Sequence, residues 1–182
     1  MAGWNFRWLE RMLAGRQLDY PRLLFMLAVA SWGLRYVLNP MTWTLVDHFN
    51  LVIHEAGHVF FWPFGRFLML LGGSLLQVAL PLAISAYFYF TRQPYSAAVT
   101  LVWTAQSLIN TSVYIADASA RQLPLITHDP NTHDWWQLLR MLGWLRYDVL
   151  LGNFVYSQGL LLYLLGLWLG FRCAVFGSRS VA

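Results

Sequence analysis

Apolar residues run along this chain in five long stretches, each bounded by prolines, glycines or arginines. A stretch of about 20 mainly apolar residues is long enough to cross a membrane as a helix. The pattern predicts membrane spans over residues 23–38, 42–62, 67–90, 97–118 and 149–171. We therefore expect an all-α, polytopic membrane helix bundle with about five transmembrane helices, forming one membrane domain over residues 1–182.

The residues before the first span have a different pattern. Trp4, Trp8 and Met12 recur at a spacing of four, and Arg7 and Arg11 lie off that stripe. An apolar stripe with flanking cations is typical of a helix that lies in the membrane interface. Residues 1–20 are therefore expected to carry an interfacial helix. No cleavable signal peptide is expected, because charged residues break the first apolar stretch.

Composition supports a lipid bilayer as the surroundings. The 182 residues are 58% hydrophobic and 11% charged, whereas a soluble domain is about one-quarter charged. Ten tryptophans and nine tyrosines suit a protein with two membrane interfaces. The net charge of +4 comes from arginines in loops, so it does not indicate nucleic-acid binding. Cys173 is the only cysteine, which excludes an intrachain disulfide and a CxxC metal site.

Arginines orient the predicted spans, because cytoplasmic loops of membrane proteins carry an excess of cations. With the N-terminus in the cytoplasm, the cytoplasmic segments hold Arg7, Arg11, Arg16, Arg22, Arg66, Arg121, Arg140 and Arg146. The opposite side holds only Arg92, Arg172 and Arg179, with Arg35 at the end of the first span. The sequence thus predicts an integral protein of a bacterial inner (cytoplasmic) membrane with a cytoplasmic N-terminus.

Residues 54–58 read His-Glu-Ala-Gly-His within the second predicted span. On a helix, His54 and His58 lie one turn apart on the same face, so both imidazoles can bind one zinc ion, Zn(2+). Glu55 is then placed to take a proton from a zinc-bound water. Histidines that are buried and bonded only to their neighbours are the alternative, but ionisable groups inside a membrane are costly and seldom serve packing alone.

A catalytic zinc usually has three protein ligands and a water. In the predicted topology, Asp117 ends the fourth span on the same side as the two histidines, so it is the first choice for the third ligand. Asp117 could instead cap the following loop or pair with Arg121. Asp47 and His48 lie nearly two turns from His54 and are interpreted as structural.

The loop predicted over residues 121–146 carries two His-Asp pairs five residues apart, at His128 and at His133-Asp134. Histidine in a polar loop is often only solvated. Because this loop begins on the side of the zinc motif, these residues are expected to be ligands, to support the site or to contact substrate. His133-Asp134 is favoured, because it leads into an apolar helix at Trp135-Trp136.

Two further features flank the motif. Gln106, Asn110 and Tyr114 share one face of the fourth predicted span, either for ligand or substrate contacts or for polar contacts between helices. Gly72, Gly73 and Ser74 interrupt the third span, where either a close helix approach or a local break is expected.

The arrangement resembles the site-2 protease family of intramembrane zinc metalloproteases. His54, Glu55 and His58 match its zinc helix, and the segment from Asn110 to Asp117 resembles its later core helix, on which an Asp completes the zinc site. The resemblance covers residues 42–120. It departs from the family at Ala118, where the family has glycine, and in lacking a PDZ-like insertion. The chain is therefore similar to a small, divergent member.

The resemblance implies a zinc-dependent hydrolysis of peptide bonds in membrane-embedded substrates. His54, His58 and Asp117 would hold the zinc, Glu55 would act as the general base, and Asn110 or His133 would steady the oxyanion. The alternative is a non-catalytic, metal-binding or protease-like accessory subunit of a larger membrane complex. A di-iron bundle is disfavoured, because the chain has one Glu-x-x-His motif. A metal transporter is disfavoured by the absence of an inverted repeat.

Overall fold

The computed structural model describes residues 18–176, in which the chain forms six α-helices and no β-strand. The helices are α2 (Tyr20–Leu38), α3 (Leu45–Phe61), α4 (Arg66–Phe90), α5 (Pro94–Ala116), α6 (Asp134–Leu142) and α7 (Asp148–Phe176). Three short 3-10 turns, η1 (Trp62–Phe64), η2 (Pro130–Thr132) and η3 (Leu145–Tyr147), connect them. The expected all-α fold is confirmed. The interfacial helix expected over residues 4–14 lies outside the described residues.

Three segments of the described chain are long and apolar enough to cross a membrane. They are Tyr20–Leu38, Arg66–Phe90 and Leu145–Val175, and they correspond to the first, third and last predicted spans. Helices α3 and α5 coincide with the other two predicted spans, but α3 has only 17 residues and α5 buries several polar side chains. Their crossing of the membrane stays a prediction.

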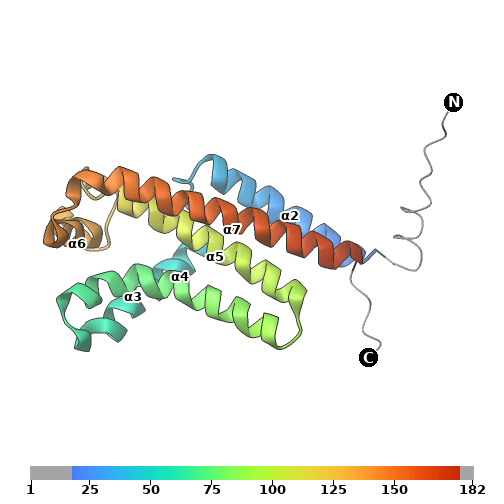
Figure 1. The fold of residues 1–182 in the computed structure, drawn as a ribbon. Helices are drawn as coiled ribbons and strands as arrows, with labels where there is room; N and C mark the ends of the chain where they lie inside the picture. Colours follow the sequence, from blue (N-terminus) through green and yellow to red (C-terminus); the bar gives the residue numbers. More distant parts are fainter. Residues whose placement is uncertain (1–17, 177–182) are drawn as a thin grey trace.

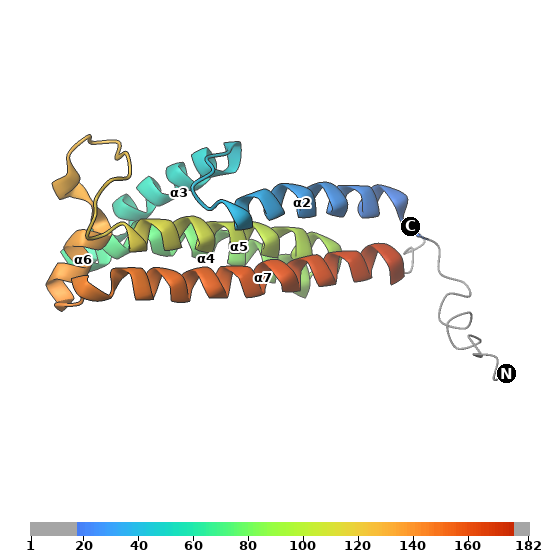
Figure 2. The same cartoon turned by 90° about the horizontal axis from the view of Figure 1, so that it is seen from above.

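The long helices lie side by side in alternating directions (Figures 1 and 2). Helix α5 packs along α7 on one side and against α4 on the other, and α2 lies on α7. Helix α3 packs against α4. Helix α4 begins and α5 ends at the same end of the bundle (Figure 1).

Glycines allow α7 to approach α5 closely. Gly152, Gly159 and Gly166 recur every seven residues on α7, so they fall on one face of the helix. A Cβ atom added at Gly159 would lie 2.8 Å from Cγ1 of Ile109. Small residues that let two backbones approach are typical of helix contacts in membranes. This contact fixes α5 against α7, so that the polar residues of α5 face α3 and α4.

The segment expected as a loop over residues 121–146 contains a helix as well. Helix α6 begins where the His133 side chain accepts a hydrogen bond from the Trp136 N–H, and it ends at Gly143, which has a φ of 70°. The helix start expected at Trp135-Trp136 is found, but the helix is a short separate element within the segment expected as a loop. A capping side chain and a left-handed glycine bound this helix of only nine residues.

Candidate metal centre

Helix α3 is built so that its polar face is buried. Thr44 caps its N-terminus, and the Asp47 carboxylate accepts a hydrogen bond from the Thr44 N–H in a capping box. From that start, the face bearing Asp47, Asn50 and His54 turns into the protein, where each of the three is at least 94% buried. His58, one turn after His54, is partly buried, and the two ring centroids are 4.8 Å apart. The histidine pair predicted from the motif is confirmed.

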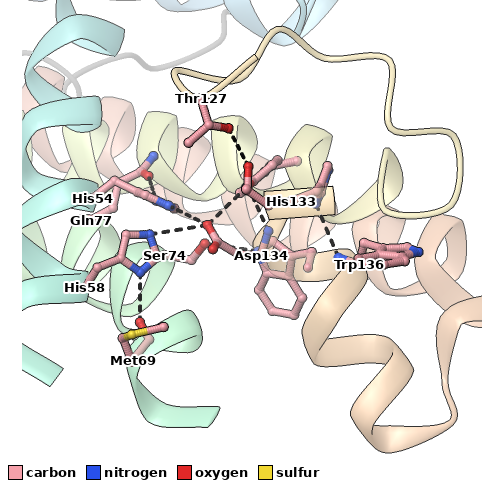
Figure 3. A network of polar contacts seen from close by, with 12 residues as sticks. His54, His58, Met69, Ser74, Gln77, Thr127, His133, Asp134 and Trp136 are labelled. Carbon is pink, nitrogen blue, oxygen red and sulfur yellow. Dashed lines mark hydrogen bonds and ion pairs between the residues drawn. The ribbon is translucent and has the colours of Figure 1, made fainter. Parts of the chain in front are cut away.

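A third ligand group joins them from a distant part of the chain. Oδ2 of Asp134, the first residue of α6, lies 3.2 Å from Nε2 of His54 and 3.3 Å from Nε2 of His58. One atom from each of these three residues lies within 4.8 Å of the others. In the part of the chain that the structure describes, His54, His58 and Asp134 are the one such group. Figure 3 shows both imidazoles pointing at Asp134.

The close packing of α3 on α4 positions His54. A Cβ atom added at Gly57 would lie 2.2 Å from the carbonyl oxygen of Gly72, so neither helix has room for a side chain there. Gly73 lies directly beneath the His54 ring, because a Cβ atom there would lie 2.5 Å from Nε2. The close helix approach expected at Gly72 and Gly73 is confirmed, and the local break is not found, since α4 is continuous.

The main chain determines which nitrogen of His58 carries a proton. Nδ1 of His58 lies 2.8 Å from the carbonyl oxygen of Met69, and a carbonyl can only accept a hydrogen bond. Nδ1 is therefore the donor, which leaves Nε2 as the nitrogen that faces Asp134. Metal-bound histidines are commonly oriented in this way, by a second hydrogen bond from the nitrogen that faces away from the metal.

The three converging atoms suit a divalent cation. Burial alone would raise the pKa of Asp134, but its hydrogen bonds to His54 and His58 hold that pKa at about 2. The carboxylate is thus charged at neutral pH. Two imidazole nitrogens and one carboxylate oxygen form a donor set that catalytic zinc sites use. The group in this structure therefore fits a metal ion.

Asp134 is held in place by its neighbours. The Tyr114 hydroxyl donates to Oδ2 of Asp134 over 3.1 Å and accepts from the Asp134 N–H over 3.0 Å. The next residue, Trp135, donates its indole N–H to the Ser74 hydroxyl on α4, over 3.0 Å. The start of α6 is therefore anchored to both α4 and α5, and the carboxylate has little freedom to leave the histidines.

Asp117 has a different environment from the one expected. Its carboxylate accepts hydrogen bonds from the N–H groups of Gln122 and Leu123, over 2.9 and 3.0 Å. Oδ2 also lies 3.4 Å from Nε2 of His133. The structure thus brings Asp134, and not Asp117, to the two histidines. The physical reason is that the loop after α5 folds back and its free amides surround the Asp117 carboxylate, the capping role that the sequence left open.

His133 links the two carboxylates and is fully buried. Its Nδ1 accepts from the Trp136 N–H, its Nε2 faces Asp117, and its ring packs on that of Tyr114 with centroids 4.2 Å apart. Burial lowers the pKa of His133, although the nearby charges of Asp117 and Asp134 oppose this effect. A neutral His133 with a proton on Nε2 fits both contacts. It supports the site from behind and does not face the cavity.

The metal group opens onto a cavity of about 840 Å³. Glu55 lines it together with all three candidate ligands. The other walls are mainly apolar and come from the segment before α3, from α4 and α5, and from the loop that arches over the site in Figure 2. They include Met41, Trp43, Leu51, Val113, Leu123 and Ile126. The motif's acidic residue thus shares a largely apolar chamber with the candidate metal group.

The other site residues expected from the sequence have different environments in the structure. Asn110 lines the cavity, but both ends of its amide are engaged, by Gln77 and by Asp47. Asn110 and the buried His133 are therefore committed to structural bonds, and the geometry does not favour either as the group that steadies an oxyanion. His128 is exposed in the loop, with a φ of 57°, and the structure does not bring it to the histidines.

Sequence reasoning gave Asp134 as a residue that could bind the metal, support the site or contact substrate, but chose Asp117 as the third ligand. Two features of the sequence favour Asp134 as a candidate ligand. A His-Asp pair stands directly before an amphipathic helix, and its histidine is able to cap that helix. Comparison of the chain with models of protein families, with curated proteins and with solved structures finds no match in any of the three.

Proposed function

We propose that this protein is an intramembrane zinc metallopeptidase, similar in its chemistry to the site-2 proteases. The convergence of His54, His58 and Asp134 on one point of a cavity that Glu55 also lines carries this proposal. The HExxH motif supplies two ligands and a base from one turn of helix. The third ligand in this proposal is Asp134, in place of Asp117.

Each residue of the site has a defined part in hydrolysis. Zinc held by His54, His58 and Asp134 would supply a Lewis acid that polarises the scissile carbonyl and makes a water molecule more acidic. Glu55 accepts a proton from that water as it attacks the carbonyl carbon, and then donates the proton to the departing amine. Tyr114 and His133 keep Asp134 in place throughout.

The surroundings of the site favour a membrane-embedded peptide as the substrate. Three segments of the described chain suit a membrane crossing, and the cavity walls are largely apolar. An apolar chamber excludes bulk water and strengthens the electrostatic interactions inside it. The arginine distribution further supports a bacterial inner membrane with a cytoplasmic N-terminus.

The proposal is tested by replacing Glu55 with glutamine, which keeps the shape of the side chain but removes the base. The full chain, loaded with zinc and reconstituted in liposomes, is mixed with single-span apolar reporter peptides, and mass spectrometry detects the products. Glu55→Gln is expected to lower the cleavage rate by about 10²–10⁴-fold. Asp19→Asn is the control, since Asp19 caps α2, far from the cavity, and asparagine also caps helices well.

Two outcomes contradict the proposal. If Glu55→Gln cleaves the reporters as fast as the wild type, Glu55 is not the base. If the wild type binds zinc but cleaves no membrane peptide, the protein is better described as the metal-binding accessory subunit.

A further inference from the structure

A chain of buried hydrogen bonds connects His54 to a residue that does not reach the candidate metal. Nδ1 of His54 lies 3.1 Å from Oε1 of Gln77, and Nε2 of Gln77 donates to Oδ1 of Asn110 over 2.8 Å. Nδ2 of Asn110 in turn donates to Oδ1 of Asp47 over 3.0 Å. Asp47, Gln77 and His54 are each at least 94% buried.

The carboxylate at the far end gives this chain a direction. Oδ1 of Asp47 accepts hydrogen bonds from Tyr36 and Gln106 as well, so Asn110 must turn its NH₂ group toward Asp47 and its oxygen toward Gln77. Gln77 must then turn its NH₂ group toward Asn110 and its oxygen toward His54. His54 consequently donates from Nδ1, which leaves Nε2, 3.2 Å from Oδ2 of Asp134, as the nitrogen available to the candidate metal.

A second series of hydrogen bonds also ends on Asp47, and in it too each donor points toward Asp47. The indole of Trp103 can only donate, and it bonds Oδ1 of Asn50 over 2.9 Å. Asn50 then donates to Oε1 of Gln106 over 2.6 Å, and Gln106 donates to Oδ1 of Asp47 over 2.7 Å. Two amide branches with independent starting points thus agree on Asp47 as the acceptor on which both end.

We infer that Asp47 is a positioning residue for the metal centre, and that it fixes the tautomer of His54 through Asn110 and Gln77. The inference rests on the metal centre of the proposed function, although Asp47 itself takes no part in the reaction. A ligand histidine binds metal through an unprotonated nitrogen, so a proton on Nε2 would oppose binding.

His54 needs this arrangement and His58 does not. The partner of His58 is a main-chain carbonyl, which cannot reverse its role. The partner of His54 is an amide, which can present either an acceptor or a donor by turning over. The chain of bonds to Asp47 removes that freedom. Asp47 is itself kept in place by Tyr36 and by Thr44, whose N–H and hydroxyl both donate to Oδ2.

A pair of glutamine variants separates this role from general packing. Gln77 and Gln106 are both 3% exposed, and both belong to branches that end on Asp47, but only Gln77 contacts His54. Gln77→Met is expected to weaken zinc binding by about 10–100-fold, the usual effect of losing a partner of a metal ligand. Gln106→Met is expected to leave the zinc affinity unchanged. Equal losses in the two variants would overturn the inference.

Nitrogen NMR of the full chain, labelled with ¹⁵N-histidine in detergent, reads the tautomer directly. The wild type, free of metal, is expected to show a proton on Nδ1 of His54, and Asp47→Asn is expected to add a form that lacks this proton. A wild-type His54 without a proton on Nδ1, or an unchanged spectrum in Asp47→Asn, would contradict the inference. The wild-type spectrum decides the matter even if a variant does not fold. Neither measurement uses peptide cleavage, so a failure of the proposed enzymatic activity would be seen separately.

Discussion

The carboxylates of Asp117 and Asp134 lie close in the structure of the site but have different partners. Asp134 faces two imidazole nitrogens and the Tyr114 hydroxyl, whereas Asp117 faces two main-chain amides and His133. A carboxylate that faces two imidazole nitrogens is stable there when protons or a metal ion lie between them. A carboxylate that faces N–H groups already has its donors. At the scale of single residues, this difference separates the candidate ligand Asp134 from Asp117, which caps the loop after α5.

Replacing each carboxylate in turn tests the distinction. Losing a partner that supports a metal ligand usually weakens zinc binding by about 10–100-fold. Asp134→Ala is expected to weaken it further, because this change removes a candidate ligand itself. Asp117→Ala is expected to retain about one zinc per chain, with a smaller loss of affinity. Mass spectrometry of the metal content, with zinc titrations of both variants, measures the effect. Retention of zinc by Asp134→Ala together with its loss from Asp117→Ala would restore the ligand set expected from the sequence.

The histidine pair was predictable because its geometry is local. Four residues of helix fix the relation of His54 to His58 whatever the rest of the chain does. Asp117 was expected nearby because it ends the fourth predicted span on the same side as the two histidines. The position of Asp134 depends on how a loop folds back over the bundle, and no local periodicity describes that path. The candidate ligand whose position depends on tertiary structure is therefore the one that sequence reasoning did not choose.

At the scale of elements, the contact between α3 and α4 controls the metal centre. The glycines at positions 57, 72 and 73 bring the two helices close enough for His54 to lie against the α4 backbone. The same contact supplies Gln77 and the Met69 carbonyl, which orient the two histidines. A helix that had to stand further away would lose both partners at once.

Gly73→Ala tests this contact. Alanine is favoured over glycine within a helix by about 1 kcal/mol, but the new methyl group would overlap the His54 ring, and overpacking costs about 1–3 kcal/mol. We expect a loss of zinc affinity in isothermal titration. Gly159→Ala is the matched control: its methyl group would crowd α5 to a similar degree, but away from the metal centre. Equal zinc affinities in the two variants would show that the α3–α4 contact does not position the ligand.

Helix boundaries were also predictable to within a few residues, since prolines and glycines mark them. Helix α6 was missed as a separate element, although Trp135 and Trp136 were recognised as the start of an apolar helix. A contact from outside the helix supports it: the guanidinium group of Arg121, in the preceding loop, lies 4.7 Å from the ring centroid of Trp136. Such contacts across the chain have no signature in a window of neighbouring residues.

At the scale of the whole molecule, a metal ion held by the candidate ligands would join the bundle to the segment that covers it. Two of the candidate ligands belong to α3, and the third belongs to α6, beyond the arching loop (Figure 2). A ligand that binds only the folded state stabilises it by about 2.7 kcal/mol when present at 100 times its Kd. Metal binding is therefore expected to stabilise the cover as well as the site.

Removal of metal from the detergent-purified protein tests this coupling. A chelator is expected to lower the Tm and to increase proteolysis within residues 121–133, because the loop loses one of its attachments. The Asp134→Ala variant is the control and should respond to the chelator in neither measurement. If the wild type becomes no more susceptible in this loop, the metal does not hold the cover in place.

His54 and Asp134 are 80 residues apart in the sequence, so they are synthesised at different times. A chain is made from its N-terminus, and its early segments fold before the later ones exist. While α3, α4 and α5 are being synthesised, the nascent protein has two histidines and a base but an incomplete ligand set. The centre comes into being only after α6 has been made and has docked on α4 and α5. Under the proposed function, a hydrolase built in this order stays inert while it is inserted beside other newly made membrane proteins.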